Sequence, residues 1–261
     1  MRNMTPADSP RLLAVSLALV MAGMSTPGTA TEYQQEPPPM KEARSTEALL
    51  TARQQAIAPV AAFAAMGEMT RLNAALEAGL DAGLSISDAQ EVLVQVYAYA
   101  GFPRSLNALG ELMKVLAARR QRGIEDAAGR APGKSIPSGP ALLAAGTANQ
   151  TRLAGAPVQG PLFEFAPAID GYLKTHLFGD IFERDNLDWQ DREIATIAML
   201  SAMEGVSAQL QAHIRIGINV GLTEPQLHLL AATLQERAGQ QTGRRAAEAL
   251  HAHLQGSRQQ P

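Results

Sequence analysis

The sequence contains no cysteine among its 261 residues. This absence excludes disulfide bonds, thiolate chemistry and cysteine-ligated metal sites. No cluster of lysine and arginine occurs either, and the formal net charge is -3. Nucleic acids and anionic membrane surfaces are therefore not expected as partners.

Several chemical motifs are also missing. The chain has no HExxH sequence, no run of carboxylates with metal-ligand spacing and no glycine-rich phosphate loop. We therefore expect no metal and no cofactor. No segment of useful length alternates apolar and polar residues as a strand would. With 46% hydrophobic and 18% charged residues, the composition is that of a folded globular protein. Because strand-like alternation is lacking, we expect an all-α fold.

The N-terminal segment differs from the rest of the chain. Its apolar run, Leu12–Met24, follows Arg11 and is too short to span a bilayer as a stable helix. Small residues ending at Ala30 follow, which is typical of a signal peptide over residues 1–30. We expect a periplasmic or secreted protein, free of the membrane after cleavage. An uncleaved anchor is the alternative.

Helical periodicity begins after a polar, proline-rich linker at residues 31–45. We expect a first helical repeat at 46–120, a connecting segment at 121–162 and a second helical repeat at 163–255. The expected helices cover about 47–66, 70–82, 86–99, 105–120, 168–177, 189–203, 208–220, 224–236 and 243–254. Proline at position 59 predicts a kink in the first of these helices.

The two repeats are similar in sequence. Shifting the chain by 138 aligns residues 72–112 with 210–250 without a gap, and nine of the 41 pairs are identical. Both segments contain a glycine that suits a helix C-terminus, followed by a hydroxyl residue that suits an N-cap. The similarity predicts a duplicated helical unit, packed as a pseudo-dimer within one chain.

Two ionisable residues form the main candidate site. Helical spacing places Glu193 and His213 on the apolar stripes of two consecutive helices. If these side chains meet, the carboxylate orients the imidazole for proton transfer. In the first repeat, the aligned residues are Ala56 and Ala75. The alternative is structural: a glutamate stabilised by the helix dipole and a half-buried histidine with a backbone partner.

Three further residues are candidates for substrate binding. Tyr97 and Arg104 flank a helix break, where the guanidinium can hold a substrate carboxylate through two hydrogen bonds. A surface arginine beside a core aromatic cluster is the alternative. His176 is a third candidate, although it can instead cap a helix end.

Two segments resemble the carboxymuconolactone decarboxylase family. One is AYAGFPRSLNAL, at residues 98–109, and the other is QLQAHIRIGINVGLTE, at residues 209–224. The resemblance implies an all-α fold of duplicated units, commonly assembled as trimers or hexamers. The same superfamily includes alkylhydroperoxidase D-like proteins, which use a Cys-x-x-Cys pair. Because this chain lacks cysteine, thiol peroxidase activity is chemically excluded.

The resemblance also implies a function. We expect a lyase that acts on a small carboxylate or lactone without a cofactor, with His213 as general acid/base and Glu193 controlling its protonation. Export would place the chain outside the compartment of the family's catabolic reaction, so the substrate is open. A non-catalytic, oligomeric binding or scaffold protein with the same fold is the alternative.

Overall fold

The computed structural model describes residues 49–258, and the regular secondary structure of these residues is entirely helical, without a strand among them. The expected signal peptide and linker lie outside the described residues. The helices are α1 (Ala52–Met66), α2 (Met69–Asp81), α3 (Ile86–Ala100), α4 (Phe102–Gln121), α5 (Pro140–Ala154), α6 (Pro161–Phe165), α7 (Pro167–Tyr172), the π-helix η1 (Leu173–Ile181), α8 (Trp189–Ala202), α9 (Ser207–Asn219), α10 (Glu224–Arg237) and α11 (Gln240–Arg258). The all-α fold is thus confirmed.

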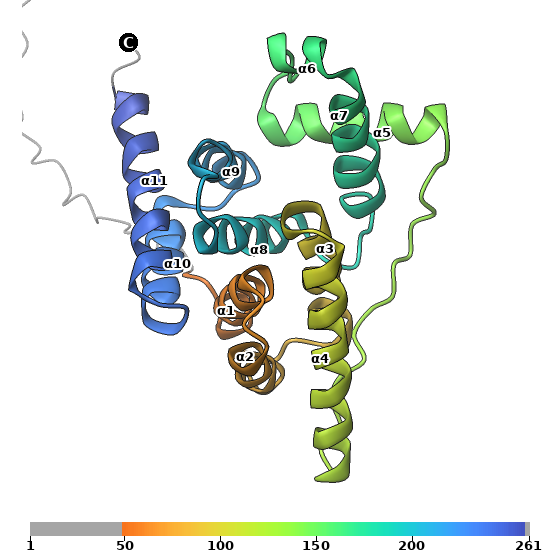
Figure 1. Ribbon diagram of the computed structural model, residues 1–261, viewed down its shortest axis with the longest axis vertical. Helices are drawn as coiled ribbons and strands as arrows, with labels where there is room; N and C mark the ends of the chain where they lie inside the picture. Colours follow the sequence, from red (N-terminus) through yellow and green to blue (C-terminus); the bar gives the residue numbers. More distant parts are fainter. Residues whose placement is uncertain (1–48, 259–261) are drawn as a thin grey trace, which may run out of the picture. The chain divides into compact units, whose positions relative to one another are not determined.

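Two helices form the centre of the described part. α1 packs on α8 (Figure 1), and both are buried on all sides, every residue being buried over Ala56–Ala65 and Asp191–Ala202. Such helices lack a solvent-facing stripe, because other helices cover each face. α2, α3, α4 and α10 pack around α1, while α9 and α11 pack on α8.

Local capping signals determine where the helices begin. Ser85 and Thr223 form the expected capping boxes at α3 and α10, and the Asp188 side chain accepts from the Asp191 backbone at α8. Gly83 and Gly221 follow α2 and α9 with φ of 97° and 100°. Glycine adopts this left-handed conformation without the steric cost of a side chain.

The helix bounds agree with the register of the expected duplication. Adding 138 to the bounds of α2, Met69–Asp81, gives Ser207–Asn219, which are the bounds of α9. α1 and α8, α3 and α10, and α4 and α11 begin at equivalent positions in the same way, with an offset of 137 for the first pair. The duplication stays our interpretation of the sequence.

The structure differs from expectation in the connecting segment and just after it. Residues 121–162 contain α5, a 15-residue helix that the low periodicity did not predict. The expected helix at 168–177 is α7 followed by η1, which extends to Ile181. α5 packs against η1 so closely that a Cβ on Gly146 would lie 1.7 Å from the carbonyl oxygen of Lys174. The first helix begins at Ala52, later than expected, and contains Pro59.

No helix in residues 49–258 combines the length and apolarity needed to cross a bilayer.

Candidate active site

The α8–α9 hairpin brings the expected acid and imidazole together. Nδ1 of His213 lies 2.8 Å from Oε2 of Glu193, a hydrogen bond between the two helices. The Glu193 side chain is 0% exposed and the His213 side chain is 10% exposed. Helical spacing left this contact open, and the structure forms it between two buried side chains.

The local sequence explains this geometry. Met203 and Gly205, the latter with φ of 77°, lie in the turn between the helices, and α9 begins at Ser207. A Cβ on Gly217 would lie 3.3 Å from Ile197 on α8, so the glycine permits close approach of the two helices. His213 lies on the buried face of α9 together with Leu210.

One oxygen of the pair is left without a partner. Oε1 of Glu193 is buried and accepts no hydrogen bond within the described part of the chain. Leaving a buried carboxylate oxygen unpaired costs free energy, so such atoms are uncommon in folded proteins. The Tyr99 ring, from α3, contacts the His213 ring edge-on, with centroids 5.6 Å apart and planes at 77°.

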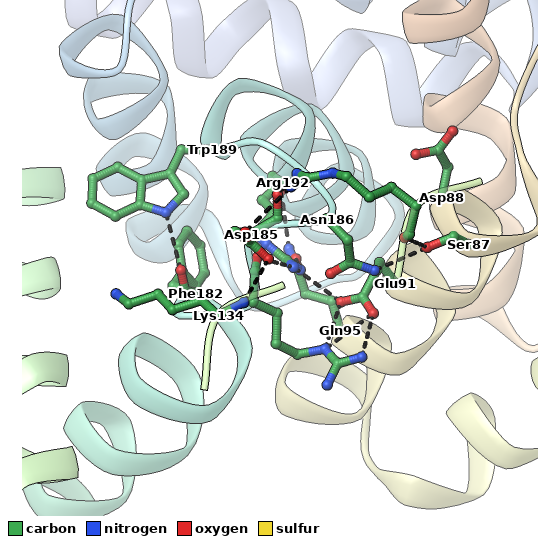
Figure 2. Close-up of polar contacts among 12 residues, drawn as sticks. Ser87, Asp88, Glu91, Gln95, Lys134, Phe182, Asp185, Asn186, Trp189 and Arg192 are labelled. Carbon is green, nitrogen blue, oxygen red and sulfur yellow. Dashed lines mark hydrogen bonds and ion pairs between the residues drawn. The ribbon is translucent and has the colours of Figure 1, made fainter. Parts of the chain in front are cut away.

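A buried ionic network lies further along α8. Figure 2 shows Arg192 of α8 and Glu91 of α3 pointing toward each other, joined by a hydrogen bond of 3.0 Å. Glu91 also accepts from Arg184, at distances from 2.7 Å to 3.0 Å. Burial alone would raise the pKa of the Glu91 carboxyl, but the hydrogen bonds from these guanidinium groups outweigh burial and hold its pKa below 4.5.

The network continues toward the histidine pair. Gln95 of α3 donates to the Thr196 hydroxyl at 2.7 Å and accepts from Arg192. Thr196 is one turn after Glu193 on α8. Sequence reasoning missed Glu91 and Arg192, because their partnership spans 101 residues and neither belongs to a motif.

Tyr97 and His176, two of the expected binding residues, line one surface pocket. Its volume is about 380 Å³, and the other lining residues are Ala98, Phe102, Ile169, Tyr172, Leu173 and Leu177. Tyr97 stacks on Phe102 with ring centroids 4.6 Å apart, and Nδ1 of His176 lies 2.9 Å from Asp180. Neither Glu193 nor His213 lines this pocket.

Arg104 belongs to neither group. It is half-buried at the start of α4, and its Nε lies 3.9 Å from the position of a Cβ on Gly67, in the turn between α1 and α2. The structure thus joins Glu193 to His213 by a hydrogen bond and places Tyr97 and His176 in one pocket lining. Arg104 belongs to neither arrangement. Within residues 49–258, no three histidine, aspartate or glutamate side chains come together as metal ligands.

One of the comparisons with known proteins found a match. Residues 167–252 match the profile of the carboxymuconolactone decarboxylase family, a range that contains α7, η1 and α8–α10 and most of α11. The part of the chain that carries Glu193 and His213 is thus similar to the carboxymuconolactone decarboxylase family. A search of the curated proteins returned no match.

Proposed function

We propose that the chain is a carboxymuconolactone decarboxylase-like lyase that removes a carboxyl group from a small lactone or related carboxylate. The observation that carries this proposal is the 2.8 Å hydrogen bond between His213 and Glu193. Both residues lie in the segment that matches the family. An imidazole held by a carboxylate is a common arrangement for general acid/base catalysis.

The roles follow from the chemistry of decarboxylation. When carbon dioxide leaves, the electron pair of the broken bond passes into the conjugated lactone carbonyl, so no cofactor is needed to hold the negative charge. Protonated His213 then gives its proton to the carbon that lost the carboxyl group. Glu193, on the other ring nitrogen, fixes the ring orientation and stabilises the charged imidazolium. Substrate contacts of Tyr97, His176 and Arg104 stay predictions.

The burial of the pair supports a second candidate, a non-catalytic oligomeric binding or scaffold protein. The exposed fractions of 0% and 10% leave a small part of the His213 ring in reach of a ligand. Under this alternative, the buried pair only holds α8 and α9 together. The two candidates differ in what a substitution of the pair does to turnover.

The experiment compares purified wild-type protein with the His213→Ala and Glu193→Gln variants. Decarboxylation of 4-carboxymuconolactone is followed first, and a metabolite screen extends the search. We expect His213→Ala to abolish turnover and Glu193→Gln to reduce it about 100-fold or more, while circular dichroism stays that of wild type. Glu193→Gln keeps the side-chain shape, so it tests the role if the alanine variant is unstable.

The control variant is His228→Ala, because the side chain of His228 is 60% exposed on α10 and is not part of the pair. This variant should retain wild-type turnover. Wild-type turnover in the His213→Ala variant overturns the proposed function.

We also propose that the protein is exported, with cleavage after Ala30. N-terminal sequencing of the protein purified from its natural host tests this step, with Thr31 expected as the first residue. An N-terminus at Met1 in the mature protein contradicts it.

A further inference from the structure

Tyr99 differs from its neighbour Tyr97 in the direction of its side chain. Successive residues of an α-helix are rotated by about 100°, so two residues separated by one position point to nearly opposite sides. Tyr97 faces the surface pocket and stacks on Phe102. Tyr99 faces the interior, where its ring contacts His213.

The hydroxyl of Tyr99 has no hydrogen-bond partner. The oxygen is buried, and within residues 49–258 no group pairs with it. The Thr196 hydroxyl lies near it but outside hydrogen-bond geometry, and Thr196 donates to the backbone carbonyl of Arg192 and accepts from Gln95. Buried hydroxyl groups are nearly always hydrogen-bonded, so an unused donor beside a candidate catalytic histidine indicates a missing partner.

A second unused polar atom is found in the same region. Oε1 of Glu193, on a side chain that is 0% exposed, is also buried without a partner. The charge of Glu193 acts on the Tyr99 hydroxyl, and Thr196 is one turn from Glu193 on α8. These two unpaired polar atoms belong to residues that both contact His213, and burying such atoms is unfavourable unless a polar group pairs with them.

The Tyr99 hydroxyl keeps its proton at neutral pH. Burial, and next the negative charge of Glu193, raise the pKa of Tyr99 above its ordinary value of 10.0. A neutral hydroxyl donates a hydrogen bond to an oxygen that becomes negative during a reaction, and it does so best in a buried site.

We propose that Tyr99 is the third residue of the site and that its hydroxyl donates to the substrate carbonyl oxygen on which negative charge develops. This inference rests on the proposed function. As the carbon–carbon bond to the carboxylate breaks, carbon dioxide leaves and the electron pair moves to that oxygen. His213 then transfers a proton to the carbon and takes up one proton from solvent, so each turnover consumes one proton and releases carbon dioxide.

The three equivalent positions in the duplicated register carry no similar group. In the register of the expected duplication, Ala56, Ala75 and Arg237 correspond to Glu193, His213 and Tyr99. These three equivalents together line a separate pocket of about 350 Å³. Within the described residues, the duplicated register therefore contains this group once. It combines Glu193 and His213 of the second half with Tyr99 of the first half.

The experiment compares Tyr99→Phe with wild type and with His228→Ala, the control variant at an exposed residue of α10. With 4-carboxymuconolactone as substrate, we expect Tyr99→Phe to lower kcat about 100-fold with little change in KM and an unchanged pH profile. His228→Ala should stay within about 2-fold of wild type, because its side chain is 60% exposed and does not contact the pair. Wild-type kcat in Tyr99→Phe overturns the inference.

A binding measurement separates this inference from the proposed function. Carbon-13 labelling at the tyrosine Cζ atoms reports hydrogen bonding of each hydroxyl, and Tyr99→Phe assigns the Tyr99 signal. Adding the lactone should shift the Tyr99 signal in wild type and in His213→Ala. A shift without loss of turnover in His213→Ala contradicts the function but supports the donor role. Loss of turnover without a shift contradicts the donor role alone, and a wild type that neither binds nor converts the lactone overturns both.

Discussion

Arg192 on α8 is fully buried and donates a 3.0 Å hydrogen bond to Glu91 on α3. Burial lowers the pKa of Arg192, while the Glu91 carboxylate opposes that shift. Each charged group depends on the other, because an isolated charge in the interior is very unfavourable. This contact joins the first half of the chain to the second.

The first prediction concerns this ion pair. Replacing Arg192 by methionine should lower the free energy of unfolding by about 3–5 kcal/mol, as expected when one partner of a buried pair is removed. Urea denaturation measures the change. Arg184→Ala is the control: its side chain is 32% exposed, and Glu91 keeps Arg192, so the loss should be about 1 kcal/mol or less. Equal losses would contradict this assignment.

The second prediction concerns acid. Because the pKa of Glu91 is lower in the folded state than the ordinary 4.5, the folded protein binds fewer protons than the unfolded chain. This contribution to stability is present above pH 4.5 and is lost as pH falls through the folded-state pKa. Unfolding measured from pH 6 to pH 3 should show a flatter acid slope for Glu91→Gln than for wild type.

Asp191→Asn should change the acid slope of stability in the opposite direction in the same experiment. Burial raises the pKa of Asp191, so its protonation favours the folded state as pH falls. Removing that group should steepen the loss of stability in acid. Identical slopes in all three proteins would contradict both assignments.

The third prediction concerns the close packing of α5 on η1. A Cβ on Gly146 would lie 1.7 Å from the Lys174 carbonyl oxygen, so Gly146→Ala must push the helices apart. We expect a loss of about 2 kcal/mol or more in thermal unfolding. Gly110→Ala is the control on α4, where a Cβ would have no atom within 4 Å. This substitution should be neutral or should stabilise by up to about 1 kcal/mol. A Gly146→Ala variant as stable as wild type would refute the predicted overlap.

The fourth prediction concerns assembly. Large apolar side chains are exposed on the neighbouring helices α6 and α7 and at the start of α4, and they include Phe165 at 89%, Phe102 at 62% and Tyr172 at 59%. Exposed patches of this kind mark interaction surfaces. We propose that this surface joins copies of the chain in the trimer or hexamer expected from the sequence.

Light scattering coupled to gel filtration tests the assembly. Phe165→Asp should reduce the mass of the wild-type oligomer to that of a smaller species. Leu49→Asp should leave the mass unchanged, since Leu49 is 58% exposed but precedes α1 and is not on α4, α6 or α7. A wild-type monomer at micromolar concentration would refute the proposal.

Most of the helices could be predicted from the sequence because their signals are local. The capping boxes at Ser85 and Thr223 involve residues three positions apart, and glycines with positive φ follow α2 and α9. The contact of Glu193 with His213 was also within reach, because a short turn and helical spacing restrict two consecutive helices to few arrangements.

The missed features depend on contacts between distant residues. Periodicity shows that Tyr97 and Tyr99 point in different directions, but only the packing of α3 on α8 decides which one meets His213. The partnership of Glu91 with Arg192 is similarly invisible along the chain. α5 was missed for another reason: its apolar residues are mostly exposed and follow no clear stripe, although Gly139-Pro140 at its start is a usable N-terminal signal.

The contacts of Arg192 with Glu91 and of Tyr99 with His213 have a historical consequence. If the chain arose by duplication, its two halves are no longer equivalent, and each now depends on contacts with residues of the other. A descendant that lost Glu91 would inherit an unpaired cation within the interior, and one that lost His213 would retain a tyrosine hydroxyl with no purpose. The two halves must therefore be inherited and diversify as a single unit.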